Sequence, residues 1–241
     1  MDARPRLYDA YPKHFIRRGH DLDAPPSGTS RPIVRPWVPR EADARVLELG
    51  CGSGGLLRQF RAGGLTDLTG VDSTQSQVDR AMAHEDGTRY VVQDAKEFLS
   101  ANERLYDLVC AFDFIEHLTV DEALEVCDLV YRSLAQGGCL VLRTPNAASL
   151  LGDYGWHADL THITQYTEYS LFQLLDAAGF CDHEVKESRR PRLGRSAFRH
   201  PVRWFLRPWT NYSLHRMAYW ARAQQPPRSY EANIEVWTFK R

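Results

Sequence analysis

The sequence contains the stretch Val46-Leu47-Glu48-Leu49-Gly50-Cys51-Gly52-Ser53-Gly54-Gly55, in which a short apolar run passes directly into a glycine-rich turn. A helical pattern follows the turn. Glycines let the backbone turn sharply and approach a ligand closely, and the start of a helix offers unpaired N–H groups. The stretch therefore predicts a strand, a turn and a helix that form a nucleotide-binding site. The alternative is a turn that serves only to pack the strand against the helix.

Similar units of strand and helix recur from Arg45 to Thr144. This alternation is typical of a parallel sheet covered by helices on both faces, so we expect a fold of the α/β class. Two further strands are predicted near the C-terminus, where partial alternation of apolar residues returns. The expected strands are Arg45–Leu49, Leu68–Asp72, Arg89–Gln93, Asp107–Phe112, Cys139–Arg143, Cys181–Glu187 and Ile234–Lys240.

Threonines mark the predicted starts of three helices. Thr74 with Gln77, and Thr119 with Glu122, have the spacing of a capping box, in which the two side chains satisfy each other's backbone N–H groups. A third helix is expected to begin near Thr167 and to end at a glycine. It buries one apolar face, formed by Leu171, Leu174, Leu175 and Ala178, before Gly179.

The chain of 241 residues is long enough for one domain with elaborations. We expect that domain over residues 45–241, preceded by a proline-rich N-terminal cover of residues 1–44. An insertion at about residues 188–232 interrupts the domain before the last strand. Between Arg189 and Tyr230 it carries ten arginines and no acidic residue, interleaved with aromatic side chains, although the net charge of the whole chain is −1.

The five cysteines are odd in number and widely spaced, which fits neither a disulfide framework nor a zinc-ligand pattern. No run approaches the roughly 18 apolar residues that a membrane span needs, and no secretory leader pattern opens the chain. These features predict a cytoplasmic location. The basic insertion is also suited to peripheral contact with the anionic inner surface of a membrane.

Acidic residues surround the glycine-rich turn. The glycines, with Asp72 twenty residues after Gly52, also fit a dinucleotide fingerprint. S-adenosylmethionine, however, carries a sulfonium and an ammonium but no phosphate, so its site gains from carboxylates that a pyrophosphate site would avoid. Glu48 lies two residues before Gly50, Asp72 can accept from ribose hydroxyls, and Asp94 can accept from an adenine amino group. The acids favour S-adenosylmethionine as the cofactor.

Five successive motifs resemble those of class I S-adenosylmethionine-dependent methyltransferases, in order and spacing. They are Val46 to Gly54, Gly70-Val71-Asp72, Gln93-Asp94-Ala95, Tyr106-Asp107-Leu108-Val109 and Leu134-Ala135-Gln136-Gly137-Gly138. The resemblance implies a Rossmann-like seven-stranded sheet, with five parallel strands and an antiparallel end. It also implies a set of cofactor-binding residues: Glu48, Gly50, Cys51, Gly52, Asp72, Ser73, Asp94, Ala95 and Phe112.

Methyl transfer from a sulfonium is an in-line displacement, and a hydroxyl acceptor needs help in losing its proton. The run Asp113-Phe114-Ile115-Glu116-His117 follows the fourth strand, and His162 follows the fifth. The run resembles the acid-x-x-Glu-His motif of ubiquinone-pathway O-methyltransferases and small-RNA 2′-O-methyltransferases. That resemblance implies a divalent ion, Mg²⁺ or Mn²⁺, held by Asp113, Glu116, His117 and His162, which lowers the pKa of the acceptor hydroxyl. Without a metal, His117, His162 or Asp113 would act directly, an imidazole as general base.

Three alternatives remain open for the acceptor. Motifs around Thr144-Pro145-Asn146 and Asp159-Leu160-Thr161-His162 resemble bacterial methyltransferases of polysaccharide and glycan biosynthesis, which favours a sugar hydroxyl on a small, phosphate-bearing glycan or nucleotide-sugar. The metal-like cluster suits RNA 2′-O-methylation, but nucleic acid is disfavoured because no RNA-binding module is attached. A non-catalytic nucleotide-binding or membrane-associated scaffold is the third. The predicted substrate-binding residues are Tyr11, His14, Asn146, His157 and Asp159.

Overall fold

The computed structural model describes Leu7 and residues 33–149, 152–186 and 232–241. Most of the predicted N-terminal cover and nearly all of the basic insertion lie outside these residues. The elements in chain order are β1 (Arg45–Leu49), α2 (Gly55–Ala62), β2 (Asp67–Asp72), α3 (Gln75–Met82), β3 (Arg89–Val92), α4 (Ala95–Ala101), β4 (Tyr106–Phe112), the 3₁₀ turn η1 (Ile115–His117), α5 (Val120–Ser133), β5 (Leu134–Pro145), α6 (Gly152–His157), α7 (Glu168–Ala177), β6 (Cys181–Val185) and β7 (Asn233–Phe239).

The strands form one sheet in the order β3-β2-β1-β4-β5-β7-β6. The first five in this order run parallel, and β7 lies antiparallel to both β5 and β6. The predicted seven-stranded Rossmann-like sheet with an antiparallel end is therefore confirmed. Strand bounds agree within two residues except for β5, which begins at Leu134 rather than at Cys139. A register shift against β4 accommodates this early start.

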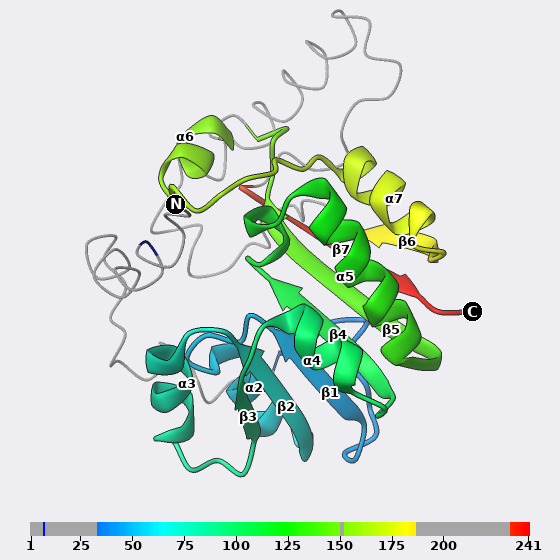
Figure 1. Ribbon diagram of the computed structural model, residues 1–241. Helices are drawn as coiled ribbons and strands as arrows, with labels where there is room; N and C mark the ends of the chain where they lie inside the picture. The colour runs from blue at the N-terminus through cyan, green and yellow to red at the C-terminus, as the bar shows by residue number, and fades with distance from the viewer. Residues whose placement is uncertain (1–6, 8–32, 150–151, 187–231) are drawn as a thin grey trace, which may run out of the picture.

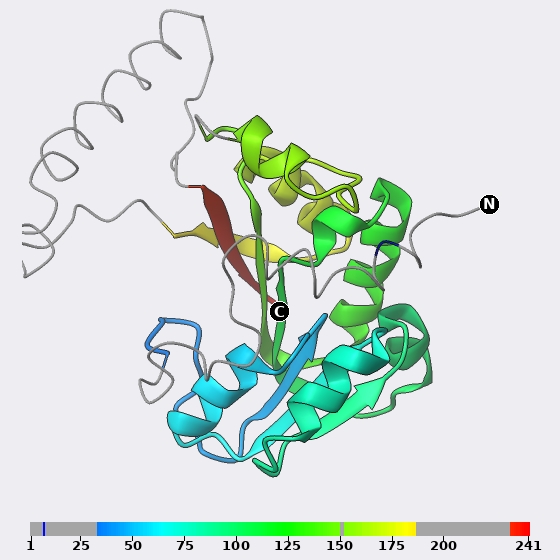
Figure 2. The same ribbon diagram turned by 90° about the vertical axis from the view of Figure 1, so that its left-hand side faces the viewer.

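The sheet has helices on both faces, as Figures 1 and 2 show. Alternate strand residues point to opposite faces, and they sort into two hydrophobic clusters. Leu47, Val109 and Leu140 pack with α4, α5 and α7 on one face. Val46 and Leu108 pack with α2 and the N-terminal Trp37 on the other face. None of the helices in the described part of the chain is long and apolar enough to cross a membrane.

Two of the three predicted helix starts have the expected caps. The Thr119 and Glu122 side chains form a capping box at α5, and Thr167 caps α7. The capping box predicted at Thr74 and Gln77 is wrong, because the Thr74 side chain makes no cap bond. The Thr74 N–H instead donates to the carboxylate of Asp72 at 2.8 Å. An acid at the end of β2 thus takes a donor near the start of α3.

The neighbours β1 and β4 mark the point where the chain order in the sheet reverses. In open α/β sheets a crevice forms at such a point, beyond the carboxyl ends of the strands. The glycine turn after β1 and the loop after β4 meet there. A Cβ on Gly50 would lie 2.9 Å from the Phe114 ring, so these two segments are in direct contact. The fold therefore joins the two sequence regions that carry the predicted chemistry.

Candidate functional site

The glycine turn depends on backbone conformations that other residues rarely adopt. Gly50, Gly52 and Gly54 have φ angles of +68°, +51° and +78°. The Gly50 and Cys51 N–H groups both donate to the Val71 carbonyl, at 2.8 and 3.1 Å, which ties the turn to β2. At Gly50 the close Phe114 ring also excludes a side chain. The turn is thus held tightly against β2 and the β4 loop.

Glu48 is a buried acid with an unsatisfied oxygen. Glu48 is the penultimate residue of β1. Only 4% of the residue is exposed, and its Oε2 atom has no hydrogen-bond partner among the described residues. Burial raises the pKa of Glu48 well above its ordinary value, while the nearby positive charge of Arg143 opposes this shift. A cationic or N–H-bearing ligand would provide the missing partner. Glu48 therefore fits the ammonium of S-adenosylmethionine.

The other two predicted acids are engaged by the backbone. The Asp72 carboxylate accepts from the Gly52 N–H at 2.9 Å and from the Thr74 N–H at 2.8 Å. Each carboxylate oxygen has a second lone pair, so these bonds leave acceptor capacity for hydroxyl groups. Asp94 caps α4 by accepting from the Lys96 and Glu97 N–H groups.

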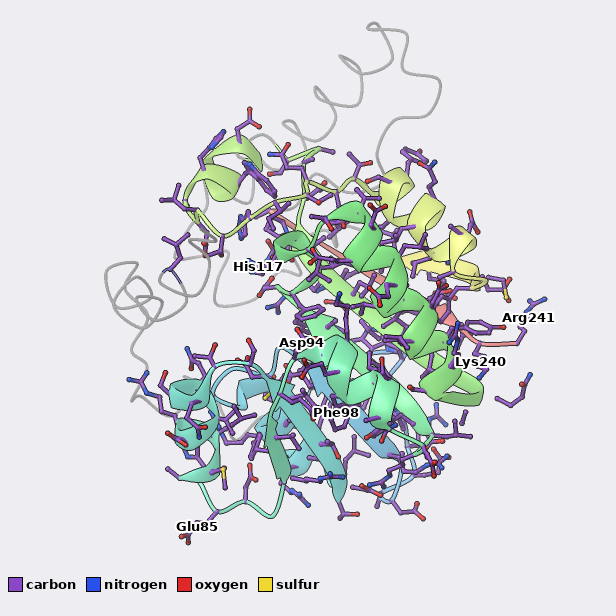
Figure 3. All side chains as sticks on the ribbon, viewed as in Figure 1. Glu85, Asp94, Phe98, His117, Lys240 and Arg241 are labelled. Atoms are coloured by element: carbon purple, nitrogen blue, oxygen red, sulfur yellow. The ribbon has the colours of Figure 1, made fainter. Side chains whose placement is uncertain are left out.

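The remaining predicted cofactor residues lie around these acids. Ser73 is exposed, whereas Ala95 and Cys51 are buried, and burial raises the pKa of the Cys51 thiol. The Phe112 ring lies between Trp37, with ring centroids 6.1 Å apart, and the guanidinium of Arg143, 4.5 Å from the ring centre. Figure 3 labels Asp94 and His117 at the carboxyl ends of the parallel strands, away from Lys240 and Arg241.

Glu116, His117 and His162 form a compact polar cluster. Their ligand atoms lie within 4.8 Å of one another, and Glu116 is 1% exposed. The Thr144 hydroxyl donates to Glu116 Oε2 at 2.9 Å. The other oxygen, Oε1, has no hydrogen bond within the part of the chain that the structure describes, and it lies 4.0 Å from His162 Nε2. That separation is too long for a hydrogen bond but within reach of one shared cation, because ligands about 2.1 Å from an ion can be about 4.2 Å apart.

Backbone hydrogen bonds bring His162 to this position from a distant part of the chain. The N–H groups of Ile163 and Thr164 both donate to the Glu116 carbonyl, at 2.7 and 3.1 Å. The Thr164 hydroxyl donates to the Leu118 carbonyl at 2.7 Å. The loop after α6 is thus fixed against η1, and the rings of His117 and His162 have centroids 5.0 Å apart.

The protonation of the cluster is shaped by burial. Burial raises the pKa of Glu116 to about 8, and the negative charge of Asp113 adds to the shift. Burial, followed by the proximity of His162, lowers the pKa of His117 and favours its neutral imidazole. A bound cation would provide a positive partner for the ionised carboxylate of Glu116. Neutral imidazoles are also good ligands for divalent transition ions. The cluster therefore fits a divalent cation.

Each histidine also has its Nδ1 atom against protein oxygen. His117 Nδ1 lies 2.9 Å from the Thr161 hydroxyl, and His162 Nδ1 lies 3.1 Å from the Trp156 carbonyl. Metal-binding histidines usually donate their second ring N–H to such a group, which orients the ring. The arrangement around the two rings matches that pattern.

Asp113 does not join the cluster. Its carboxylate forms an ion pair with Arg143, and its N–H donates to the Arg143 carbonyl at 2.7 Å. Asp113 also has a φ angle of +51°, a conformation that aspartate tolerates better than most residues. The structure thus reduces the four predicted metal ligands to Glu116, His117 and His162, because the neighbouring strand provides a guanidinium for the fourth.

The predicted substrate-binding residues are dispersed. Asn146 is buried, and its side chain accepts from the Ala148 N–H at 3.0 Å. Asp159 is buried and accepts from Thr161, while His157 is exposed at the end of α6. Tyr11 and His14 lie outside the described residues.

Sequence reasoning missed several residues that shape the site: Phe114, Arg143, Thr144, Trp156 and Thr161. Thr144 and Thr161 belong to the motifs Thr144-Pro145-Asn146 and Asp159-Leu160-Thr161-His162. Their presence in these motifs was the signal that could have identified them as site residues. Nothing in the local sequence pairs Arg143 with Asp113, which is 30 residues away.

Comparison with known proteins shows the family of the chain. The sequence model of a family described as a methyltransferase domain matches residues 27–185. A ubiquinone biosynthesis O-methyltransferase of Coxiella burnetii is 27% identical over 58% of this chain and 68% of its own length.

Two solved structures have a similar fold. A SAM-dependent methyltransferase from Archaeoglobus fulgidus superposes with a TM-score of 0.61 at 21% identity, over 85% of this chain and 89% of its own. Phosphoethanolamine N-methyltransferase 2 of Haemonchus contortus, solved with S-adenosyl-L-methionine, gives 0.57 at 19% identity, over 85% of this chain and 50% of its own.

Proposed function

Because the chain belongs to the methyltransferase domain family, we propose that it transfers the methyl group of S-adenosylmethionine to a hydroxyl oxygen activated at Glu116, His117 and His162. One of the solved structures with a similar fold is described as a SAM-dependent methyltransferase, and another was solved with S-adenosyl-L-methionine bound. The observation that carries the choice of a hydroxyl is the buried Glu-His-His cluster beside the glycine turn. The O-methyltransferase among its relatives supports the same choice.

When bound, S-adenosylmethionine would supply a methyl group on a cationic sulfur, and the acceptor oxygen would bond to the methyl carbon as the carbon–sulfur bond breaks and the neutral sulfur leaves. The residues of the crevice orient it. Glu48 offers its unpartnered Oε2 to the ammonium, and Asp72 offers its remaining lone pairs to the ribose. The Phe114 ring packs on Gly50. These contacts fix the cofactor at the end of β1 and leave the cluster after β4 for the acceptor.

The cluster can remove the acceptor proton in two ways. Glu116 Oε1 and one nitrogen of each histidine would hold a divalent cation such as Mg²⁺ or Mn²⁺, which would lower the pKa of a hydroxyl bound to it. Without a cation, the neutral imidazole of His117 or His162 would accept the proton as general base. The first route is favoured because Glu116 has a buried oxygen that no donor among the described residues reaches.

For the acceptor, we propose a sugar hydroxyl on a phosphate-bearing glycan or nucleotide-sugar. The support is the composition of the basic insertion, since ten arginines among aromatic residues suit phosphate and sugar contacts. The second candidate is a ribose 2′-hydroxyl of RNA, which the same cluster and the same arginines would suit.

The test measures transfer of a radiolabelled methyl group to nucleotide-sugars, lipid-linked glycans and RNA, with and without EDTA. We expect transfer to a sugar acceptor that EDTA abolishes and Mn²⁺ or Mg²⁺ restores. E116Q and H162A should reduce transfer strongly while leaving cofactor binding intact, and E125Q, at an exposed glutamate of α5, serves as the control. Full transfer in EDTA would exclude the metal route, and full transfer by both cluster variants would exclude the cluster. Methylation of RNA alone would replace the sugar acceptor with the second candidate.

A further inference from the structure

A buried chain of hydrogen bonds runs behind the cluster, from a carboxylate through a hydroxyl to an imidazole. We propose that Thr161 is a positioning residue that fixes His117 in the tautomer with its proton on Nδ1, and that Asp159 sets the direction of the Thr161 hydroxyl. This inference rests on the proposed role of His117 in the cluster. It concerns residues that the sequence assigned differently or missed, since Asp159 was predicted to contact the substrate.

The first step is the direction of the Thr161 hydroxyl. Its Oγ1 atom lies 2.6 Å from Asp159 Oδ1. The backbone N–H of Thr161 donates to the same Oδ1 at 2.9 Å, which marks that oxygen as an acceptor. A hydroxyl has a single proton, and a contact of this length requires the proton to lie between the two oxygens. The Thr161 hydroxyl therefore donates to Asp159.

The second step follows at His117. The same Oγ1 atom lies 2.9 Å from His117 Nδ1, and with its proton given to Asp159 it can only accept there. The backbone carbonyl of Thr161 lies 3.2 Å from the same nitrogen, and a carbonyl also can only accept. Two acceptors at one ring nitrogen require an N–H at that nitrogen. A neutral imidazole has one proton, so its lone pair is then on Nε2.

Burial strengthens the preference of His117 for the tautomer with its proton on Nδ1. Thr161 and Asp159 are both buried, as is His117. Hydrogen bonds in such surroundings are strengthened, and unmatched donors or acceptors are costly. A lone pair on Nδ1 would face two acceptors, whereas a lone pair on Nε2 can bind a cation or accept a proton. The arrangement thus prepares the ring for the chemistry of the cluster before any ligand arrives.

A purely structural role for Thr161 makes a different prediction. The bond from its N–H to Asp159, two residues earlier, is a local turn that shapes the loop. That bond does not need the Thr161 side chain. The hydroxyl contact with His117 instead joins residues 44 positions apart. Replacement of Thr161 by valine keeps the turn and the approximate volume but removes the hydroxyl, so it separates the two roles.

The experiment records ¹⁵N spectra of the histidine rings of the full chain at pH 8, without metal, and assigns His117 by its loss in H117A. In the wild type we expect Nδ1 to give the signal of a protonated ring nitrogen. In T161V the tautomer balance should move several-fold toward the proton on Nε2, and T161S should restore it. T66V is the control, because the Thr66 hydroxyl likewise donates to a backbone carbonyl, that of Ala42, but belongs to the segment before β2; it should leave the His117 signals unchanged.

A second readout measures Mn²⁺ and cofactor affinity by calorimetry. T161V should weaken Mn²⁺ binding about 10- to 100-fold and leave S-adenosylmethionine binding within about twofold of the wild type, since cofactor contacts lie elsewhere. An unprotonated Nδ1 in the wild type, or identical tautomers in wild type and T161V, would overturn the inference. If the tautomer moves as expected but the wild type binds no Mn²⁺, the metal route of the proposed function fails and the role of Thr161 stands.

Discussion

Replacing Glu48 by glutamine is expected to weaken cofactor binding and to stabilise the folded protein at the same time. The substitution keeps the shape of the side chain and removes its negative charge. Glu48 Oε2 is buried without a partner in the described structure, so the charge has a cost in the cofactor-free protein and a use only when a cationic ligand is present. The two effects of E48Q should therefore have opposite signs.

The loss of affinity can be estimated from the contact that the carboxylate would make. A hydrogen bond to a charged group contributes about 1.5–3 kcal/mol. At 1.4 kcal/mol for each factor of ten, this corresponds to S-adenosylmethionine binding that is roughly 10- to 150-fold weaker. Titration calorimetry measures it directly. E125Q, which removes an exposed charge on α5, should bind the cofactor like the wild type.

The effect on stability has a definite dependence on pH. Burial raises the pKa of Glu48 in the folded protein well above its ordinary value. Between these two pKa values the folded state binds more protons at this site than the unfolded state, so stability falls as pH rises through that window. The glutamine variant lacks this loss. Denaturant unfolding should show E48Q more stable than the wild type at pH 7 to 8, with the difference shrinking toward pH 5. Equal stability at all pH values, or unchanged cofactor affinity, would refute the role given to Glu48.

Two further predictions concern neighbouring parts of the site. G50A should lose cofactor binding and reduce the free energy of unfolding by about 1–3 kcal/mol, because a Cβ would lie 2.9 Å from the Phe114 ring. G64A is the control, because Gly64 also has a positive φ but open space around it, so it shows the effect of backbone strain alone. Calorimetry and denaturant unfolding measure both variants. T144V removes the donor 2.9 Å from Glu116 Oε2, so it should raise the pKa of Glu116 further above about 8 and weaken Mn²⁺ binding about 10- to 100-fold at pH 7. Unchanged Mn²⁺ affinity in T144V would contradict this account of the cluster.

The sheet could be predicted because its signals are local. Apolar runs of strand length alternate with helical patterns, and the glycines after β1 can only be explained by a tight turn. The errors occur where two local preferences compete. Thr74 and Gln77 have the spacing of a capping box, but the Thr74 N–H donates to the Asp72 carboxylate instead of to Gln77. β5 begins at Leu134 because Leu134 pairs with Tyr106 of β4.

The site was predicted less completely because its decisive contacts are distant in sequence. The acid-x-x-Glu-His pattern located Glu116 and His117, and a later histidine completed the cluster. Asp113 belongs to the same pattern, but strand register places Arg143 beside Phe112 on the neighbouring strand, and the guanidinium takes the Asp113 carboxylate. Only the pairing of β4 with β5 determines that contact. A sequence motif therefore identifies which residues follow a strand, while the register between neighbouring strands decides which of them are free of an ion pair and can bind a ligand.

Three buried glutamates of the described structure, Glu48, Glu116 and Glu235, differ in how their carboxylates are satisfied. Glu235 on β7 is buried, but Trp37, Arg35 and Lys186 all contact its carboxylate. Glu48 and Glu116 are equally buried, yet each keeps one oxygen without a hydrogen bond among the described residues. An unsatisfied buried carboxylate opposes folding, so its retention at two adjacent strand ends is best explained by ligands that complete it. The ligands differ because the surroundings differ: Glu48 stands beside a glycine turn, and Glu116 stands beside two imidazoles whose Nδ1 atoms face protein oxygens. The same physical criterion thus supports the two proposed roles, a cationic cofactor after β1 and an acceptor-activating centre after β4.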